Sequence, residues 1–459
     1  MSVENRRCPG GVLSSFGQRP VPNAMPSAIV VDGGRGVTGD VHVSGSKNSG
    51  LALAAAALLA SGISTLEGLP PVEDINNMGR ILRYFGVAVS RRGDTVQMDA
   101  THAAYHPVPP ELTRSLRASI LVLGPLVARL GRVRLSLPGG CTIGRRPVEE
   151  HLRGLKKLGA RVKVTDGYIE ATASGLQGAV LHLQSPSVTG TANLMMAACL
   201  AQGATHIHNA AREPEVVDLT ACLMEMGAEI QGAGSGHLTI VGHGRLLSPY
   251  RYRVMEDRIE AGTFLILGAI AGTPLTVHPC RAAHQTALIE KLRAVGARVE
   301  IGANAVTVRK AEQPVAVDIQ TGPYPAFPTD LQPQFMVLLS LVEGISEITE
   351  TLFELRFSQA SGLNKMGANV QVHGNTATIS GVPHLSAAEV TGSDLRAAAS
   401  LVMAAVAARG RSVVWGVPLI DRGYHELEGK LEKIGVAIRR LHQPGEITRG
   451  QNATMVSAL

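Results

Sequence analysis

The chain repeats one pattern of apolar and polar positions six times. In each copy, apolar residues at helical spacing lead to Gly-Val or Gly-Ala, and a short β-like run follows. The glycines of successive copies are separated by 68 to 73 residues, which favours a true repeat over a chance recurrence in a chain rich in alanine and glycine. The six copies are LRYFGVAV, LKKLGARVKV, LMEMGAEI, LRAVGARVEI, LNKMGANVQV and LEKIGVAI, with Gly86, Gly159, Gly227, Gly296, Gly367 and Gly435.

Each copy predicts a helix that ends at its glycine and is followed by a strand. Helices commonly end on a residue in the left-handed conformation, which glycine adopts without steric cost. Upstream of the glycine, the chain carries an alanine-rich helical stretch and a β-branched run such as THIHNA or SVVWGV. Two helices and several strands in each unit of about 70 residues predict an α/β protein. We expect two similar domains of three units each.

Arginine recurs in the segments between the strand and the second helix. Five of the six copies carry one, 11 to 15 residues before the glycine. Arginines near helix N-termini reinforce the backbone N–H groups and the helix dipole, which already favour anions. A single arginine of this kind is as often a solvated surface residue, but the recurrence favours anion binding by the set. The five are Arg146, Arg212, Arg281, Arg356 and Arg422.

Composition narrows the class of protein. The 459 residues are 45% hydrophobic and 17% charged, which is typical of a folded globular protein and excludes general disorder. Five cysteines without a CxxC pair argue against a disulfide framework or structural zinc site, and favour a reducing compartment. The net charge of +6 is modest, and one Trp, seven Tyr and seven Phe are too few for a nucleic-acid-binding face. A modest positive net charge remains compatible with small anionic substrates.

The sequence also predicts where the protein works. Its longest strongly apolar run, 51–60, has ten residues, whereas a membrane span needs about 20. Arg6 and Arg7 stand near the start, but no continuous apolar segment follows them, so an export signal is not predicted. We expect a cytoplasmic protein without a transmembrane helix, in which 1–26 form a flexible extension and 446–459 a flexible tail.

One glycine-rich segment, PGGCTIGRRP, carries Cys141 beside two arginines. Neighbouring positive charge lowers the pKa of a thiol, so Cys141 is the cysteine with the surroundings of a reactive group. Cys199 and Cys222 lie in apolar helical runs and are expected to be small core residues. Cys280 lies in a crossover segment and is ambiguous.

Two further segments carry candidate chemistry. VSGSKNSG places Lys47 and Asn48 between a short strand and an alanine-rich helix. FPTDLQPQF places Asp330 where it is either a helix N-cap or a catalytic base. No Ser/His/Asp arrangement, P-loop or metal-ligand spacing competes with these segments. The sequence therefore predicts a site built from Lys, Arg, Cys and Asp.

Eight segments of the chain, in their order, resemble the enolpyruvyl transferases. The PGGC loop is similar to that of the UDP-N-acetylglucosamine enolpyruvyl transferases rather than the shikimate-pathway relatives. The resemblance runs from about Ile29 to Leu441 and implies a two-domain inside-out α/β barrel with three repeats in each domain. It implies one domain of 27–46 plus 255–445, and a second of 47–254 that carries the cysteine loop. The segments are SGSKN, LRASI, LPGGCTIGRRP, NAAREPEVVD, DRIEAGTF, FPTDLQ, SDLRAAASL and IDRGY.

The resemblance also implies a reaction, in which the enolpyruvyl group of phosphoenolpyruvate moves to the 3-hydroxyl of UDP-N-acetylglucosamine and phosphate is released. Cys141 then acts as general acid, Asp330 aligns and deprotonates the hydroxyl, and Lys47 and Arg422 hold phosphoenolpyruvate. No metal or organic cofactor is implied, and the loop cysteine is expected to be the target of fosfomycin. The other substrate-binding residues implied are Asn48, Arg117, Arg146, Pro147, Val148, Glu149, Glu150, Ser187, Val188, Thr189, Leu352, Arg356 and Arg396.

The sequence departs from the family pattern near the expected nucleotide. Glu149 and Glu150 stand where the family has an aspartate and then an apolar or amide residue, and Leu355 is a bulky residue near the expected sugar. An enolpyruvyl transferase of a nucleoside-antibiotic type pathway, acting on UMP or another nucleotide, is therefore the alternative to a cell-wall enzyme. A non-catalytic nucleotide-binding paralogue is a third possibility, which the four retained catalytic residues disfavour. The expected partners are phosphoenolpyruvate and a uridine nucleotide, not nucleic acid or a membrane, and the oligomeric state stays open.

Overall fold

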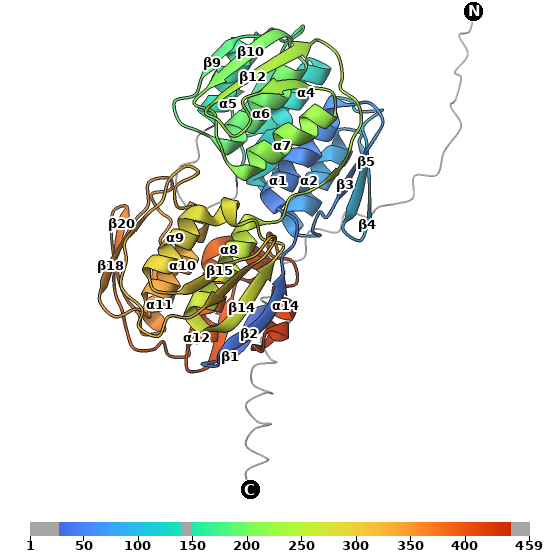
Figure 1. The fold of residues 1–459 in the computed structure, drawn as a ribbon. Helices are drawn as coiled ribbons and strands as arrows, with labels where there is room; N and C mark the ends of the chain where they lie inside the picture. Colours follow the sequence, from blue (N-terminus) through green and yellow to red (C-terminus); the bar gives the residue numbers. More distant parts are fainter. Residues whose placement is uncertain (1–26, 140–147, 442–459) are drawn as a thin grey trace, which may run out of the picture.

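The computed structural model describes residues 27–139 and 148–441, which form two lobes (Figure 1). Each lobe has its own hydrophobic cluster. One cluster draws its residues from between Leu51 and Val254, and the other from 29–43 and 259–438. The described chain contains helices and six small sheets, none of which closes into a barrel, so the expected α/β class is confirmed.

Five of the six described sheets have four strands and one has three. Each four-stranded sheet combines one parallel pair with two antiparallel pairs. The first lobe has the sheets β13 (Arg251–Arg253), β3 (Ile63–Glu67), β5 (Thr95–Asp99), β4 (Ala88–Arg92); β6 (Arg132–Ser136), β8 (Tyr168–Thr172), β7 (Arg161–Thr165); and β11 (Glu229–Gln231), β12 (His237–His243), β10 (Gln202–His208), β9 (Val180–His182). The second lobe has β21 (Glu389–Thr391), β22 (Gly410–Trp415), β1 (Ala28–Gly33), β23 (Ala437–Leu441); β15 (Arg298–Ile301), β16 (Val306–Arg309), β14 (Gly272–His278), β2 (Val37–His42); and β17 (Ile319–Gln320), β18 (Ile345–Thr349), β20 (Thr376–Ser380), β19 (Asn369–His373).

Helices fill the interior of both lobes, and the sheets lie outside them (Figure 1). In the first lobe these are α1 (Lys47–Ala56), η1 (Ala57–Leu59), α2 (Glu73–Tyr84), α3 (Pro110–Arg114), η2 (Arg117–Val122), α4 (Leu123–Leu130), α5 (Glu149–Lys157), α6 (Val188–Cys199) and α7 (Pro214–Glu225). In the second they are α8 (Arg258–Ala271), η3 (Ala282–Gln285), α9 (Thr286–Ala294), η4 (Thr329–Leu331), α10 (Gln332–Leu339), α11 (Gln359–Lys365), α12 (Leu395–Ala407), α13 (Val417–Ile420) and α14 (Leu427–Lys433).

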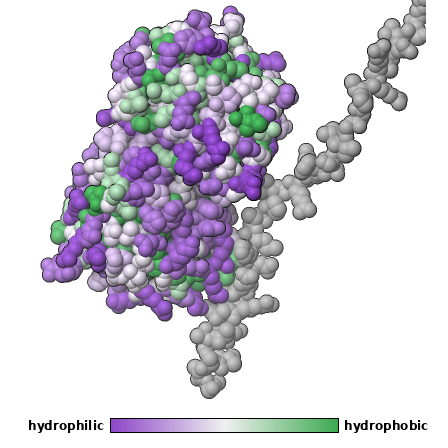
Figure 2. Space-filling model, turned by 45° about the vertical axis from the view of Figure 1, so that its right-hand side comes forward, coloured by the Kyte–Doolittle hydropathy of each residue, from purple (hydrophilic) through white to green (hydrophobic). Residues whose placement is uncertain are grey.

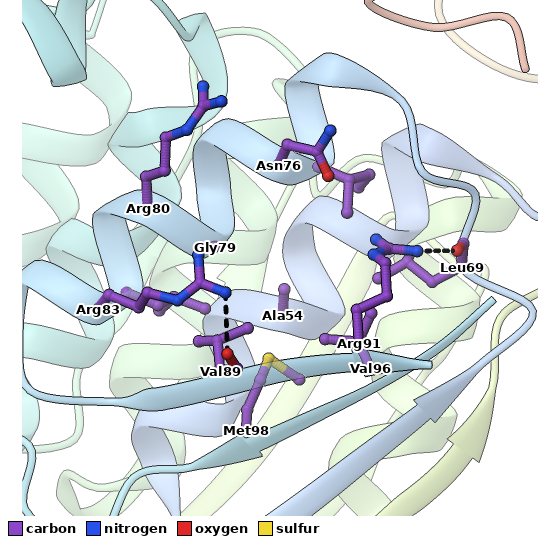
Figure 3. Close-up of a pocket in the computed structure, with 12 residues that line it drawn as sticks. Ala54, Leu69, Asn76, Gly79, Arg80, Arg83, Val89, Arg91, Val96 and Met98 are labelled. Carbon is purple, nitrogen blue, oxygen red and sulfur yellow. Dashed lines mark hydrogen bonds between the residues drawn. The ribbon is translucent and has the colours of Figure 1, made fainter. Parts of the chain in front are cut away.

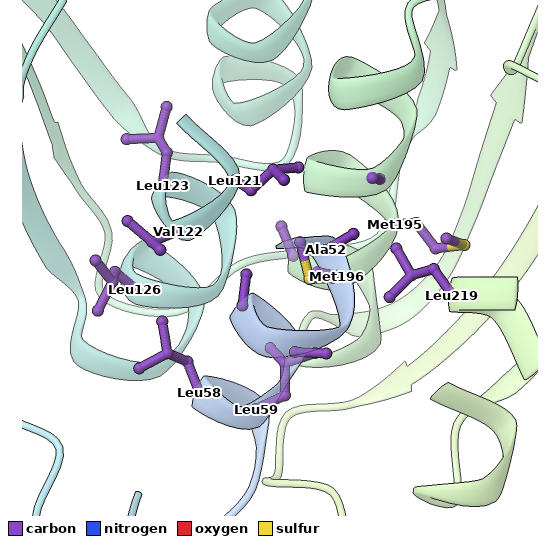
Figure 4. Packing of buried hydrophobic residues seen from close by; sticks show 14 of the residues in the cluster. Ala52, Leu58, Leu59, Leu121, Val122, Leu123, Leu126, Met195, Met196 and Leu219 are labelled. Atoms are coloured by element: carbon purple, nitrogen blue, oxygen red, sulfur yellow. The ribbon is translucent and has the colours of Figure 1, made fainter. Parts of the chain in front are cut away.

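The central helices are buried on nearly every face. In α1 every residue except Asn48 is buried, and in α8 every residue except Ala271. Figure 4 shows how Ala52 and Leu59 of the α1–η1 segment pack with Leu121 of η2 and Met196 of α6. Alanine-rich helices can approach one another closely because their side chains are small, which explains why the chain uses so many alanines and so few aromatic residues.

The repeated helix, glycine and strand pattern is confirmed. All six glycines have a positive φ, between +80° and +99°. Each stands between a helix and a strand, and the six strands are edge strands of six different sheets. The glycines therefore turn the chain from an inner helix to an outer sheet in every unit. The six strands are β4, β7, β11, β15, β19 and β23.

The chain passes between the lobes twice, and the two passages are hydrogen-bonded to each other. The Ser46 N–H donates to the carbonyl of Met255 at 2.7 Å, and the Asp257 N–H donates to the carbonyl of Ser44 at 2.9 Å. This junction places the N-termini of α1 and α8 side by side. Within the described residues, no helix is long and apolar enough to span a membrane.

Candidate active site

Lys47, the first residue of α1, lies at the junction between the lobes. Its buried side chain donates from Nζ to Asp74 Oδ2 at 3.0 Å. Its backbone N–H donates to Oδ2 of Asp257, the N-cap of α8, at 3.2 Å. The hydroxyl of Ser46 caps α1 by accepting from the Ser49 N–H, which fixes the first turn of the helix. Residues of both lobes therefore fix the position of Lys47.

Asp74, in the first turn of α2, joins Lys47 to Arg422 of the second lobe. The Nε of Arg422 donates to Asp74 Oδ1 at 2.9 Å. Burial alone would raise the pKa of this carboxyl, but the charges and hydrogen bonds of Lys47 and Arg422 hold the pKa below its usual value. The sequence analysis missed Asp74, because an acidic residue in the first turn of a helix is ordinary and carries no signal of function.

Asp330 lies between two buried arginines. Its Oδ2 accepts from Nε and Nη2 of Arg396 at 3.2 and 2.9 Å, and its Oδ1 lies 2.8 Å from Nη2 of Arg356. Burial would raise the pKa of Asp330, but the charges of Arg396, Arg356 and Lys47 outweigh it and hold the pKa well below the usual range. The side chain of Asp330 caps no helix, since neither η4 nor α10 has a side-chain cap. The N-cap interpretation of Asp330 is therefore wrong.

The two arginines are fixed by their own surroundings. Arg396 follows Asp394, the N-cap of α12, and its guanidinium lies 5.3 Å from the centre of the Tyr424 ring. Arg356 donates from Nη1 to the hydroxyl of Thr329 at 3.0 Å. Both arginines are almost fully buried, so their charges act in a medium where they are weakly screened. Lys47, Arg422, Arg356 and Arg396 thus form a cluster of cations around two carboxylates at the junction.

The glycine-rich loop begins close to another cation. Arg117, at the start of η2, donates from Nη1 to the carbonyl of Pro138 at 3.2 Å. Three of the predicted site residues, Cys141, Arg146 and Pro147, lie outside the described residues. Of the expected nucleotide residues that follow, Val148 is buried and Glu149 is exposed at the start of α5.

Glu150 and the segment 187–189 lie together in the first lobe. Oε1 of Glu150 accepts from the Gln184 N–H at 3.0 Å and from Nη2 of Arg153 at 2.5 Å. Ser187 caps α6 by accepting from the Gly190 N–H, and Val188 and Thr189 form the first turn of that helix. The extra carboxylate of Glu150 is therefore engaged with the protein's own donors.

His151, which the sequence analysis did not single out, links this segment to the core. Asn193 donates from Nδ2 to His151 Nδ1 at 2.7 Å, so the proton lies on Nε2, which donates to the hydroxyl of Thr189 at 3.2 Å. Burial, with the nearby charge of Arg117, lowers the pKa of His151 to about 3. His151 is therefore a neutral imidazole that positions Thr189.

The remaining predicted positions are three expected substrate neighbours and two of the recurrent arginines. Asn48 is half-buried beside Lys47, whereas Leu352 and Leu355 are exposed in the segment before Arg356. Arg212 donates to the carbonyl of Gly234 and Arg281 pairs with Glu256, and neither arginine forms an ion pair with Asp74 or Asp330. Of the recurrent arginines that are described, only Arg356 and Arg422 join the cluster.

The three described cysteines are buried. Burial raises the thiol pKa of Cys199 and of Cys280 to about 12. Cys222 is buried in α7, so the interpretation of Cys199 and Cys222 as core residues is confirmed, and Cys280 is a core residue as well. Among the described residues, no group of three or more His, Cys, Asp or Glu side chains is arranged to hold a metal ion.

A second set of contacts across the junction was not predicted. Arg258 of α8 donates from Nε to the two oxygens of Glu215 in α7, at 3.0 and 3.1 Å, and both side chains are buried. The Tyr324 N–H donates to Oε1 of Glu213 at 3.3 Å. The segments NAAREPEVVD and DRIEAGTF, which belong to the resemblance, thus meet face to face.

Known proteins resemble the chain over nearly all of its described length. Residues 31–431 match the family model described as EPSP synthase (3-phosphoshikimate 1-carboxyvinyltransferase). The chain is 48% identical over 413 residues to the UDP-N-acetylglucosamine 1-carboxyvinyltransferase of Desulfatibacillum aliphaticivorans, with 90% of this chain and 99% of the relative covered. It is 49% identical over 418 residues to the enzyme of the same name from Anaeromyxobacter sp. strain K, with the same coverage.

Solved structures show the same fold. The enolpyruvyl transferase NikO from Streptomyces tendae superposes with a TM-score of 0.82 at 27% identity, with 91% of this chain and 99% of that chain covered. EPSP synthase from Acinetobacter baumannii superposes with a TM-score of 0.70 at 18% identity, with 91% and 100% covered, and supports the fold alone. The resemblance inferred from the motifs is confirmed: the chain belongs to the EPSP synthase (3-phosphoshikimate 1-carboxyvinyltransferase) family and is an enolpyruvyl transferase.

Proposed function

We propose that the protein transfers the enolpyruvyl group of phosphoenolpyruvate to the 3-hydroxyl of UDP-N-acetylglucosamine and releases phosphate. The observation that carries the proposal is the cluster of Lys47, Arg422, Arg356 and Arg396 at the junction of the lobes. Phosphoenolpyruvate carries a phosphate and a carboxylate, and a preorganised set of cations binds both groups and stabilises the phosphate as it leaves. Relatives 44–49% identical over 90% of the chain have the name of this activity, which favours it over the alternatives.

The reaction is an addition followed by an elimination. Asp330 takes the proton of the 3-hydroxyl as the sugar oxygen bonds to C2 of phosphoenolpyruvate, and the thiol of Cys141 gives a proton to the C3 methylene. The product of this step is a tetrahedral phospho-ketal. Loss of a methyl proton and of phosphate then regenerates the double bond as an enol ether. Two arginines hold the carboxyl of Asp330 ionised, so it can accept a hydrogen bond from the 3-hydroxyl, orient it and receive its proton as the sugar oxygen bonds to carbon.

Substrate contacts follow from the same assignment. Phosphoenolpyruvate lies against Lys47, Arg146, Arg396 and Arg422, and Arg117 lies near the phosphates. The acceptor nucleotide extends from the second lobe across the junction into the first lobe. Its proposed contacts are Asn48, Pro147, Val148, Glu149, Glu150, Ser187, Val188, Thr189, Leu352 and Arg356.

We assign 27–46 with 255–445 to one domain and 47–254 to the other, each an inside-out α/β barrel of three units. The separate hydrophobic clusters and the six helix–glycine–strand units support this division. On this assignment the enzyme acts in the cytoplasm, in peptidoglycan biosynthesis. Its partners are phosphoenolpyruvate and the nucleotide, and it is a target of fosfomycin.

A phosphate-release assay with three acceptors tests the proposal. Phosphoenolpyruvate is held constant, and UDP-N-acetylglucosamine, UMP and shikimate 3-phosphate are compared by kcat/KM. We expect phosphate release with UDP-N-acetylglucosamine at a kcat/KM at least 100-fold above that with either other acceptor. A preference for UMP would assign the enzyme to a nucleoside pathway, and no release with any acceptor would overturn the assignment.

A further inference from the structure

A cavity with a volume of about 220 Å³ lies between α2 and the strands β4 and β5 (Figure 3). No residue of the cation cluster lines it. Its base is apolar and includes Leu69, Val96 and Met98, all of them buried. The volume is below the range of about 300–1,000 Å³ that drug-sized ligands occupy, so the cavity suits a small molecule.

Two arginines of the cavity wall have no carboxylate partner. Arg83 of α2 donates from Nη2 to the carbonyl of Val89 at 2.8 Å, and Arg91 of β4 donates from Nη1 to the carbonyl of Leu69 at 2.8 Å. Neither forms an ion pair with any residue that the structure describes. Figure 3 shows the two guanidiniums on opposite sides of the space above Ala54.

Arg91 is partly shielded from solvent in the cavity wall. The side chain is half-buried, and burial lowers the pKa of its guanidinium because the charged form is partly desolvated, while Asp94 attracts it only from beyond ion-pair distance. Arg80, which also belongs to the wall, differs because it pairs with Glu73 at 2.6 Å. An anion in the cavity would therefore meet two cations, Arg83 and Arg91, that the protein leaves without counter-charge.

Gly79 keeps the space open. It lies inside α2, where glycine costs about 1 kcal/mol of stability relative to alanine. A Cβ atom at this position would meet nothing closer than 3.7 Å, where the nearest atom is Cγ1 of Val89, so packing does not demand a glycine. Because Gly79 has no side chain, this part of the cavity wall leaves the volume free for a bound molecule.

We propose that this cavity binds a small carboxylate with an apolar chain. The carboxylate lies between Arg83 and Arg91, whose planar guanidiniums match the two oxygens of a carboxylate. The chain lies over Leu69, Val96 and Met98, where its burial contributes roughly 25 cal/mol for each Å² removed from water. This site is independent of the proposed transferase reaction.

Calorimetric titration of the full chain with octanoate tests the proposal. Octanoate is expected to bind with a stoichiometry of one. Acetate, which lacks the apolar chain, and 1-octanol, which lacks the carboxylate, are each expected to bind at least tenfold more weakly. Arg91→Gln is expected to weaken octanoate binding at least tenfold. Arg92→Gln is the matched control, because Arg92 belongs to the same strand but lies outside the cavity wall, and it should leave the affinity unchanged.

A variant that fills the cavity provides the second test. Gly79→Leu is expected to abolish octanoate binding while the helical circular dichroism is retained. If Gly79→Leu does not fold, the comparison of Arg91→Gln with Arg92→Gln still decides. No binding at millimolar octanoate, equal affinities for octanoate and 1-octanol, or an unchanged affinity in Arg91→Gln would each overturn the proposal.

Discussion

Lys47 and Arg422 donate to the two oxygens of one carboxylate, that of Asp74, at 3.0 and 2.9 Å. The two cations come from opposite ends of the sequence and from different lobes. Like charges this close repel one another, and the repulsion is strong where solvent is excluded. Asp74 offsets the repulsion, and it therefore couples the assembly of the substrate site to the packing of the two lobes.

Asp74→Asn should destabilise the protein. The substitution removes the negative charge that Lys47 and Arg422 share in a buried ion-pair network, so we expect the free energy of unfolding to fall by about 3 kcal/mol. Glu73→Gln is the matched control, because the neighbouring Glu73 pairs with the exposed Arg80 and such pairs contribute about 0–1 kcal/mol. Urea unfolding of both variants measures the difference, and equal losses would show that the network contributes little.

Asp330→Asn should affect turnover rather than binding. If Asp330 takes the proton of the acceptor hydroxyl, kcat falls at least 100-fold while both substrates still bind. Asp166→Asn, at an exposed turn far along the sequence from the cluster, serves as the control and should leave kcat unchanged. Steady-state kinetics and calorimetric binding separate the two effects. Near-normal turnover in Asp330→Asn would leave Asp330 with a purely structural role.

His151 should make the protein less stable as the pH falls. Its pKa is about 3 in the folded protein against about 6.5 in the unfolded chain, so the unfolded chain binds the proton more readily. The stabilisation is fully present above pH 6.5 and is lost as the pH falls towards 3. At pH 5 the loss is about 2 kcal/mol, at 1.36 kcal/mol per pKa unit.

Urea unfolding at pH 7.5 and pH 5 measures this effect in the wild type and in His151→Gln, which does not titrate. The wild type should lose about 2 kcal/mol more than the variant over this interval. NMR of the imidazole nitrogens provides a direct check, because His151 should remain neutral at pH 5. A resonance of His151 that titrates near pH 6.5 would contradict its assignment as a buried, neutral imidazole.

Fosfomycin should label one cysteine. The described thiols of Cys199, Cys222 and Cys280 are buried and have raised pKa values, so they are poor nucleophiles. We expect a single covalent adduct on Cys141, formed faster when the acceptor nucleotide is present, and drug resistance with retained activity in Cys141→Asp. Intact-mass and peptide mass spectrometry locate the adduct. Labelling of several cysteines, or of none at millimolar drug, would contradict the assignment of Cys141.

The sequence was sufficient to predict the repeated helix–glycine–strand pattern because its signals are local. A glycine such as Gly227 ends a helix through its own φ, and the apolar periodicity around it defines the flanking elements. The ambiguous role of Asp330 needed the structure, since a carboxylate at a helix start looks the same in sequence whether it caps the helix or meets Arg356 and Arg396.

The contacts across the lobe junction could not be predicted from local pattern. Arg212 and Arg422 occupy equivalent positions in their repeats, yet only Arg422 faces Asp74. Which arginine joins the site depends on how units far apart in the chain are placed. Asp74 carried no signal for the same reason, because its role arises from Lys47 and Arg422 together.

The enzyme transfers an intact enolpyruvyl group to a sugar hydroxyl. Proton NMR of a reaction containing the enzyme, phosphoenolpyruvate and UDP-N-acetylglucosamine tests it directly, because the product carries two vinyl protons on an ether at C3 of the sugar. We predict that these resonances appear in step with the release of phosphate. Release of phosphate with formation of free pyruvate, and no vinyl ether on the sugar, would contradict the account.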